Sequence, residues 1–174
     1  MNFNIEHTLK ILEKTPIFIE TLLFDLPDIW IQTNEGENTW SPFDVVGHLI
    51  NGEKTDWVVR TKIILAESTD KNFPSFDRFS QFEASKGKSI SDLINEFKIV
   101  RNQNIQFLKS LNLLESDLDK TGIHPDFGEV TLRQLLSTWM VHDLGHVNQI
   151  TRVLAKNYNT EVGPWKQYLS VLER

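Results

Sequence analysis

The stretch TWMVHDLGHVNQITRVL, residues 138–154, has the apolar spacing of an amphipathic helix and carries two histidines, His142 and His146, four residues apart. At about 100° per residue, the two imidazoles lie one helical turn apart in height and about 40° apart around the axis. His146 falls inside the apolar stripe, while Gly145 lies on the polar flank beside it. The stretch therefore predicts a helix whose histidines stand at the edge of a partly solvated cleft.

Three other segments of the chain show the same helical periodicity, and stretches rich in turn residues separate them. Pro16 lies inside the first segment and predicts a kink or a late start of that helix. The predicted helices cover about residues 4–24, 41–67, 89–113 and 131–157. Residues typical of helix starts mark three of them: Ser41 with Pro42, Ser89 with Asp92, and Thr131 with Gln134.

Four amphipathic helices in a chain of 174 residues predict one all-α domain, residues 1–174, built as a four-helix bundle. A short extra helix is expected near the C-terminus, at about residues 163–172. The connections 25–40, 68–88 and 114–130 are long, which argues against a bundle with tight up-and-down turns. The 68–88 connection carries four phenylalanines, and two roles stay open for it: covering a cleft or forming an oligomer contact.

The composition limits the class of function. A formal net charge of −6 argues against a general nucleic-acid binder, because phosphate binding needs a basic face. No run of ~18 apolar residues is present, so no membrane association is expected. The N-terminal residues do not resemble a signal peptide, and we expect a cytoplasmic protein. The absence of cysteine excludes thiolate ligands and a thiol nucleophile from the chain itself.

A third imidazole, His48, lies one to two turns into the second predicted helix, and Gly52 one turn later leaves space beside it. A lone histidine on an apolar helix face is more often a hydrogen-bonded core residue than a ligand. If the second and fourth helices are neighbours, however, His48 can meet the His142 and His146 pair. Three imidazoles with an open position suit zinc, nickel, copper or iron(II).

Other residues near the histidines have two readings each. Thr55 and Gln149 either brace the metal ligands or simply line the site, and Trp139, one turn before His142, is a candidate for its apolar wall. Trp57 projects to the side of its helix opposite His48 and is expected to face another helix or a partner subunit. No side chain stands out as a general base by type and spacing.

Three segments together resemble the DinB/YfiT-like family of metal-dependent enzymes over about residues 1–157. These are WSPFDVVGHLINGE at Trp40–Glu53, HPDFGEVTLRQLL at His124–Leu136 and HDLGHVNQI at His142–Ile150. The resemblance implies a four-helix bundle of unusual connectivity, often a homodimer. It also implies a divalent metal, commonly nickel or zinc, held by the residues that match the family's ligands: His48, His142 and His146. One departure is Gly145, where family members often have a larger residue.

Enzymes in this superfamily include transferases that join a low-molecular-weight thiol, such as bacillithiol or mycothiol, to an electrophile. The resemblance therefore implies a metal-dependent enzyme that transfers such a thiol to a small-molecule substrate. Two alternatives stay open: a metal-dependent hydrolase, and a stress-related protein without catalysis in which the metal ties helices together. Structural metal sites usually recruit four protein ligands, so a set of three histidines favours an open, reactive site.

Overall fold

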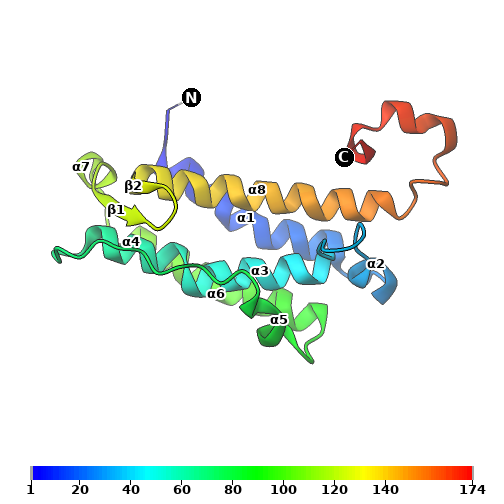
Figure 1. The fold of residues 1–174 in the computed structure, drawn as a ribbon, viewed down its shortest axis with the longest axis horizontal. Helices are drawn as coiled ribbons and strands as arrows, with labels where there is room; N and C mark the ends of the chain where they lie inside the picture. The colour runs from blue at the N-terminus through cyan, green and yellow to red at the C-terminus, as the bar shows by residue number, and fades with distance from the viewer. Residues whose placement is uncertain (1, 174) are drawn as a thin grey trace.

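The four predicted helical segments form a bundle in the computed structural model, which describes residues 2–173 (Figure 1). The all-α prediction is therefore confirmed. The bundle helices are α1 (Ile5–Leu23), α3 (Pro42–Thr55) continued by α4 (Trp57–Leu65), α6 (Ile90–Ser110) and α8 (Leu132–Lys156). Ser41, Ser89 and Thr131 cap α3, α6 and α8, each accepting a hydrogen bond from a backbone N–H three residues later.

The order of the helices around the bundle differs from the order in the chain. Helix α1 packs against α6 and α8, and α3 packs against the same two helices, so α1 and α3 lie diagonally across the bundle. Figure 1 shows α1 beside α8, with α3 beside α6. A simple up-and-down bundle would place consecutive helices side by side. The diagonal arrangement explains the long connections, and it brings α3 next to α8.

The second predicted helix is interrupted, which the sequence did not indicate. Asp56 separates α3 from α4 and has φ −118° and ψ −78°. At the interruption, the side-chain amide of Asn104 in α6 donates to the backbone carbonyl of Glu53 (2.9 Å). The break therefore depends on a partner far away in sequence, and it changes the direction of every side chain in α4 relative to α3.

The connections also contain structure that the sequence analysis described only as irregular. A short helix α2 (Asp28–Gln32) lies in the first connection and α5 (Ser80–Ser85) in the second. The third contains α7 (Glu115–Leu118) and an antiparallel hairpin of β1 (Thr121–His124) and β2 (Gly128–Thr131). The expected C-terminal helix consists of two 3₁₀ segments, η1 (Gly163–Tyr168) and η2 (Ser170–Leu172).

The hairpin is joined to the 68–88 connection by backbone hydrogen bonds. Phe73 N–H donates to the Ile123 carbonyl (2.9 Å), and Ile123 N–H donates to the Lys71 carbonyl (2.8 Å). Gly122 allows the close approach, because a Cβ built there would lie 2.3 Å from the Phe73 ring. The hairpin and the 68–88 connection thus form one continuous cover along α4.

The apolar core has two parts. One cluster contains Leu12, Ile105, Leu132 and Trp139, and the other contains Ile19, Leu49, Phe97 and Ile150. The first cluster precedes the second along α1 and α8 and follows it along α6, so the two clusters occupy different levels of the bundle. A layer of buried charged residues lies at the level between them.

Arg101 is the centre of this buried layer. Its guanidinium binds the carboxylates of Glu53 in α3 (2.8 Å) and Asp143 in α8 (2.7 and 3.0 Å). All three side chains are at most 2% exposed. Burial raises the pKa of Glu53, but its oxygens also accept hydrogen bonds from Asn104 (2.8 Å) and the Trp139 indole (3.0 Å). The layer therefore connects α3, α6 and α8 through hydrogen-bonded polar groups.

Pro16 connects α1 to the same layer. The helix runs through Pro16, and a proline cannot donate the backbone hydrogen bond that the carbonyl of Leu12 would otherwise accept. Arg101 Nη1 donates to this carbonyl instead, at 2.7 Å. The proline that predicted a kink thus frees an acceptor for the buried arginine, and all four bundle helices meet at one side chain.

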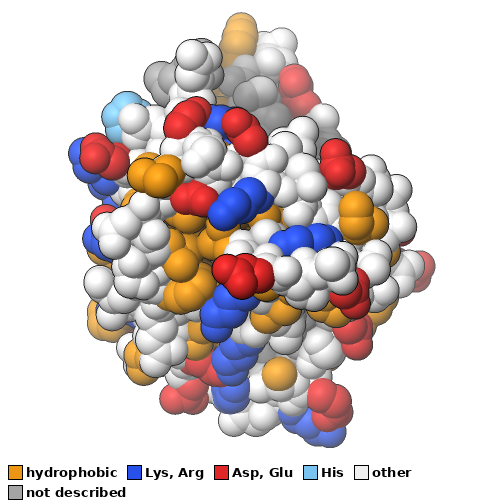
Figure 2. Space-filling view, turned by 90° about the vertical axis from the view of Figure 1, so that its left-hand side faces the viewer, with side chains coloured by type: hydrophobic (Ala, Val, Ile, Leu, Met, Phe, Trp, Pro, Cys, Tyr) orange, Lys and Arg blue, Asp and Glu red, His pale blue; other side chains and the backbone are white. Residues whose placement is uncertain are grey.

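The outer surface gives no sign of a membrane-spanning segment. No helix within residues 2–173 combines the length and the hydropathy needed to cross a bilayer. The face shown in Figure 2, at the end of the bundle that carries α7 and the hairpin, has acidic and basic side chains interspersed around hydrophobic ones.

We predict that Arg101→Met lowers the free energy of unfolding by about 3–5 kcal/mol, because it leaves two buried carboxylates without a positively charged partner. Urea denaturation followed by circular dichroism measures the change. Arg133→Met is the matched control, since Arg133 makes its ion pairs with Glu115 and Asp119 at the surface. Equal midpoints for the two variants would show that the buried layer does not hold the helices together.

Candidate metal centre

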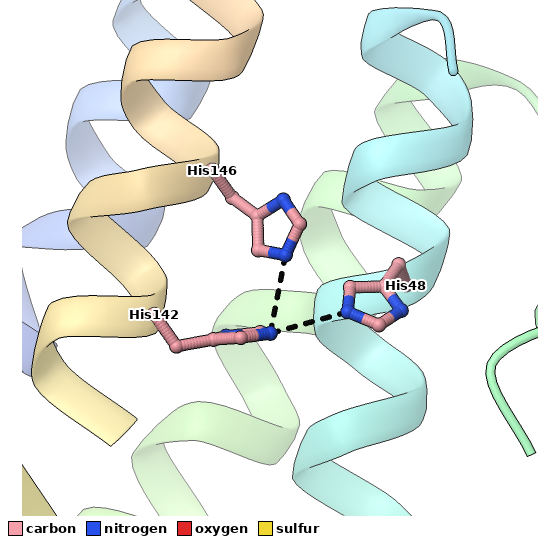
Figure 3. A group of neighbouring side chains, drawn as sticks. All are labelled: His48, His142 and His146. Carbon is pink, nitrogen blue, oxygen red and sulfur yellow. Dashed lines mark hydrogen bonds between the residues drawn. The ribbon is translucent and has the colours of Figure 1, made fainter. Parts of the chain in front are cut away.

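His48, His142 and His146 converge between α3 and α8 (Figure 3). The Nε2 atom of His142 lies 3.2 Å from Nε2 of His48 and 3.1 Å from Nε2 of His146. One nitrogen from each ring lies within 4.8 Å of the other two. The diagonal placement of α1 and α3 is what makes this meeting possible, because it sets α3 beside α8.

Two of the three nitrogen–nitrogen separations match those around a tetrahedral metal ion. Nitrogen ligands placed tetrahedrally at about 2.0–2.1 Å from zinc lie about 3.3–3.4 Å apart, close to the two Nε2–Nε2 separations seen here. Three protein ligands leave a fourth position open, as in catalytic rather than structural zinc sites. The geometry of the side chains therefore suits a divalent transition metal.

Gln149 orients one of the three rings. Its Oε1 lies 2.9 Å from Nδ1 of His146, so this Nδ1–H donates and Nε2 keeps its lone pair for a ligand bond. The buried Nδ1 atoms of His48 and His142 have no hydrogen-bond partner within residues 2–173. Gln149 is therefore the one residue of that range that fixes the tautomer of a candidate ligand.

The environment keeps the imidazoles neutral. Burial lowers the pKa of His48 to about 3, and the charges of His146 and Arg78 contribute. Burial also lowers the pKa of His142 to about 3, with contributions from His146, His48 and Arg101. The pKa of His146 is lowered by burial as well. Neutral imidazole is the form that binds metal ions, so protons do not compete for the site near pH 7.

Aromatic rings surround the histidines. The Trp40 ring lies 4.7 Å from His48 and is stacked at 6.3 Å from His146, measured between ring centroids. Phe76, from the 68–88 connection, meets His48 edge-on at 5.6 Å, and Trp57 meets His142 edge-on at 5.1 Å. These rings limit the access of water to the histidines from several directions.

A pocket of about 650 Å³ opens onto the three histidines. One side of it is formed by α3 and α4, through Gly52, Asp56, Trp57 and Arg60. The 68–88 connection and the hairpin tip, residues 124–127, form the other side. Of the two roles open for the 68–88 connection, the structure shows the first, since Ser75, Phe76 and Arg78 line the pocket.

Three other residues singled out in the sequence are Thr55, Trp139 and Trp57, and they differ in how close they lie to the pocket. Thr55 is exposed, donates to the Asn51 carbonyl (2.8 Å) and does not line the pocket. Trp139 is fully buried behind Trp57, with the two indoles stacked at 5.7 Å. Trp57 faces another helix, as expected, but the expectation that it lies opposite His48 is wrong, because the break at Asp56 rotates α4.

The two glycines singled out in the sequence have different surroundings. The space beside Gly52 is taken by the Trp57 indole, since a Cβ there would lie 3.1 Å from its Nε1. Gly145 is exposed and does not line the pocket, and a Cβ added to it would have no other atom within 4 Å. The departure at Gly145 therefore leaves the pocket wall unchanged.

Two charged residues of the pocket were not identified from the sequence as site residues: Asp56 and Arg60. They form a buried ion pair, and burial raises the pKa of Asp56 to about 6, against the lowering effect of Arg60. Their signal was an Asp and an Arg four residues apart among apolar residues of TDWVVR. The sequence places Asp56 within about 80° of His48 but does not mark it as a general base, and an unbroken helix at about 100° per residue turns Arg60 away from that face.

Comparisons with known proteins agree with this architecture. A family model described as the DinB superfamily matches residues 12–150. The chain belongs to the DinB superfamily. A solved structure, YfiT from Bacillus subtilis, is similar with a TM-score of 0.74 over 87% of this chain and 86% of that one, at 18% identity. YfiT is described as a probable metal-dependent hydrolase with an unusual four-helix bundle topology. No curated protein matches by sequence.

The DinB superfamily assignment and the likeness to YfiT support the fold, whereas the assignment of the metal ligands rests on the geometry of this chain.

We predict that Gln149→Ala lowers the affinity for zinc about 10- to 100-fold, because His146 loses the acceptor that orients its ring. Competition with a chromogenic chelator measures the affinity. Thr55→Ala serves as the control and is expected to leave it unchanged. Equal affinities of wild type and Gln149→Ala would remove Gln149 from the site.

A second prediction concerns the metal-free protein. The pKa of His48 is about 3 in the folded chain and about 6.5 in the unfolded chain. As the pH falls below about 6.5, His48 therefore takes up a proton in the unfolded chain but stays neutral in the folded chain. The free energy of unfolding therefore decreases between pH 6.5 and 4.5. The decrease should be smaller in His48→Leu by up to about 2–3 kcal/mol.

Urea denaturation at several pH values, after removal of metal with a chelator, measures this pH dependence. His7→Leu changes an exposed histidine and should keep the wild-type slope. If His48→Leu and wild type lose stability in parallel, His48 is not held neutral by the fold.

Proposed function

We propose that this protein is a metal-dependent enzyme in which His48, His142 and His146 hold a divalent transition metal, nickel or zinc, and that it transfers a low-molecular-weight thiol to a small electrophilic substrate. The observation that carries the proposal is the convergence of three neutral imidazoles on the wall of a 650 Å³ pocket. Such a metal would act as a Lewis acid that lowers the pKa of a thiol or water at its open position.

The residues around the site support a reactive rather than a structural role. The chain has no cysteine, so the thiol must arrive with a co-substrate, and the pocket has the size of typical small-molecule sites. Trp40, Phe76 and Trp57 shield the histidines and provide apolar contact for bound molecules. The helices are already joined by the Arg101 layer, which leaves little need for a metal as a structural tie.

Hydrolysis is a second candidate, and Asp56 favours it. Its carboxyl lines the same pocket and has a pKa raised to about 6, which suits a group that accepts a proton near neutral pH. The description of YfiT as a probable metal-dependent hydrolase supports the same reading. In this candidate Asp56 would take the proton from an attacking water, and no thiol would be needed.

We also infer a cytoplasmic homodimer. Large apolar side chains are exposed on the neighbouring helices α1 and α8, namely Ile17, Phe18, Val141 and Leu144, and homodimers commonly cover such residues. A mass of twice the chain's 20.2 kDa in light scattering would support the dimer, and a mass of 20.2 kDa would contradict it.

The proposal predicts about one bound transition metal per chain in protein purified without a histidine tag. Elemental analysis should show its loss in His48→Ala and in His146→Ala. His124→Ala is the matched control, because His124 lines the same pocket outside the three-histidine group and should keep the metal. The metal-loaded protein should then couple a small thiol to an activated aryl halide, and both ligand variants should fall to the background rate.

Hydrolysis of nitrophenyl esters without any thiol, lost in Asp56→Asn, would replace transfer by the second candidate. Bound metal with neither activity, together with a melting temperature that depends on the metal, would indicate a structural site. If no metal binds even after incubation with nickel or zinc, the enzyme proposal fails.

A further inference from the structure

Arg60 is a buried charge whose surroundings do not use most of its hydrogen-bonding capacity. Its side chain is 8% exposed and lies on α4 at the pocket wall. The Nε atom is in ion-pair contact with one carboxylate oxygen of Asp56, four residues earlier. The guanidinium carbon lies over the Phe73 ring, 5.2 Å from its centroid, in a cation–π contact.

The terminal amino groups of Arg60 have no hydrogen-bond acceptor among the residues that the structure describes. Within residues 2–173, no carbonyl, hydroxyl or amide oxygen accepts a hydrogen bond from either of them, and Asp56 is the one carboxylate in contact. A guanidinium carries five N–H donors. The fully buried Arg60 atom without a hydrogen-bond partner is Nε, which makes only the ion-pair contact, whereas neither terminal nitrogen is fully buried, so both are open to the pocket. Here Nε contacts Asp56, and the two terminal amino groups are left to bind a molecule in the pocket.

The charge of Arg60 reaches the pocket. Burial lowers the pKa of His124 at the hairpin tip, and the positive charge of Arg60 lowers it further. Arg78, on the 68–88 connection, lines the same pocket and contributes to the low pKa of His48. Arg78 has no ion pair or hydrogen bond through its side chain within residues 2–173. Two arginines from different segments therefore line the pocket beside the three histidines, together with the carboxylates of Asp56 and Asp126.

We propose that Arg60 is the binding site for an anionic oxygen group, a carboxylate or a phosphate, of the molecule that enters this pocket. The planar fork of the guanidinium matches two oxygens of such a group, and Arg78 adds a second positive charge. The substrate class is thus a small molecule with an oxyanion at one end and its reacting centre at the histidines. This last step rests on the proposed function; the binding of the anion to Arg60 does not.

Direct binding of small anions to the untagged full chain tests the inference. Succinate and inorganic phosphate are titrated, with neutral succinamide as the uncharged counterpart, and the fluorescence of the pocket tryptophans reports binding. We expect binding of at least one anion and none of succinamide. Comparison of succinate with phosphate identifies which oxyanion the site prefers, and a preference for either supports the proposal.

Three variants locate the anion. Asp56→Asn combined with Arg60→Met removes both members of the buried pair, so that no charge is left unpaired, and should weaken binding about 10- to 100-fold. Arg60→Lys keeps the charge without the fork and should give an intermediate loss. Arg133→Met changes a surface arginine remote from the pocket and should bind as wild type.

The His146→Ala variant separates this inference from the proposed metal function. Anion binding retained in His146→Ala and lost in the Arg60 variants supports the Arg60 site, whether or not a metal is bound. Binding lost in His146→Ala and kept in the Arg60 variants would place the anion on the metal and overturn the Arg60 site. Elemental analysis of the Arg60 variants tests independently whether the histidines still hold a metal. Absence of anion binding to the wild type also overturns the inference.

Discussion

The ion pair of Arg101 with Glu53 and Asp143 is the interaction on which the bundle depends. Burying a guanidinium and two carboxylates is costly, and it is tolerated only where the charged groups find partners of opposite charge and further hydrogen bonds. The terminal amino groups of Arg101 meet this condition with acceptors from α1, α3 and α8, including the Leu12 carbonyl that Pro16 leaves free. A helix that slid by one turn would leave a charge unpaired, so the layer fixes the relative heights of the helices.

The same layer fixes the relative heights of the histidines in the candidate metal centre. Asp143 follows His142 directly in α8, and Glu53 lies five residues after His48 in α3. Because Arg101 holds both carboxylates, α3 and α8 cannot shift along each other without separating the Nε2 atoms of His48 and His142, which are 3.2 Å apart. The polar layer is therefore a support for the site as much as for the fold, although none of its three charged residues lines the pocket.

The parts that could be predicted from sequence are those fixed by local physics. Capping residues and apolar periodicity located the ends of the long helices to within a few residues, and the spacing of His142 and His146 predicted their shared face. The break at Asp56 and the hairpin could not be predicted, because distant partners stabilise them: Asn104 for the break, and residues 71–73 for the hairpin. Arg60 was missed for the same reason, since its direction depends on the break.

The two buried arginines show how hydrogen bonding separates structural from functional charge. Both are long, nearly inaccessible cations paired with carboxylates, and composition or burial alone would treat them alike. The terminal amino groups of Arg101 make four hydrogen bonds, and its role ends within the protein. Those of Arg60 make none within residues 2–173, although they lie at a pocket wall that also carries three neutral imidazoles. Buried polar groups with a structural role are normally hydrogen-bonded within the protein, as the terminal groups of Arg101 are. The unpaired terminal groups of Arg60 beside a pocket are instead typical of a ligand-binding site.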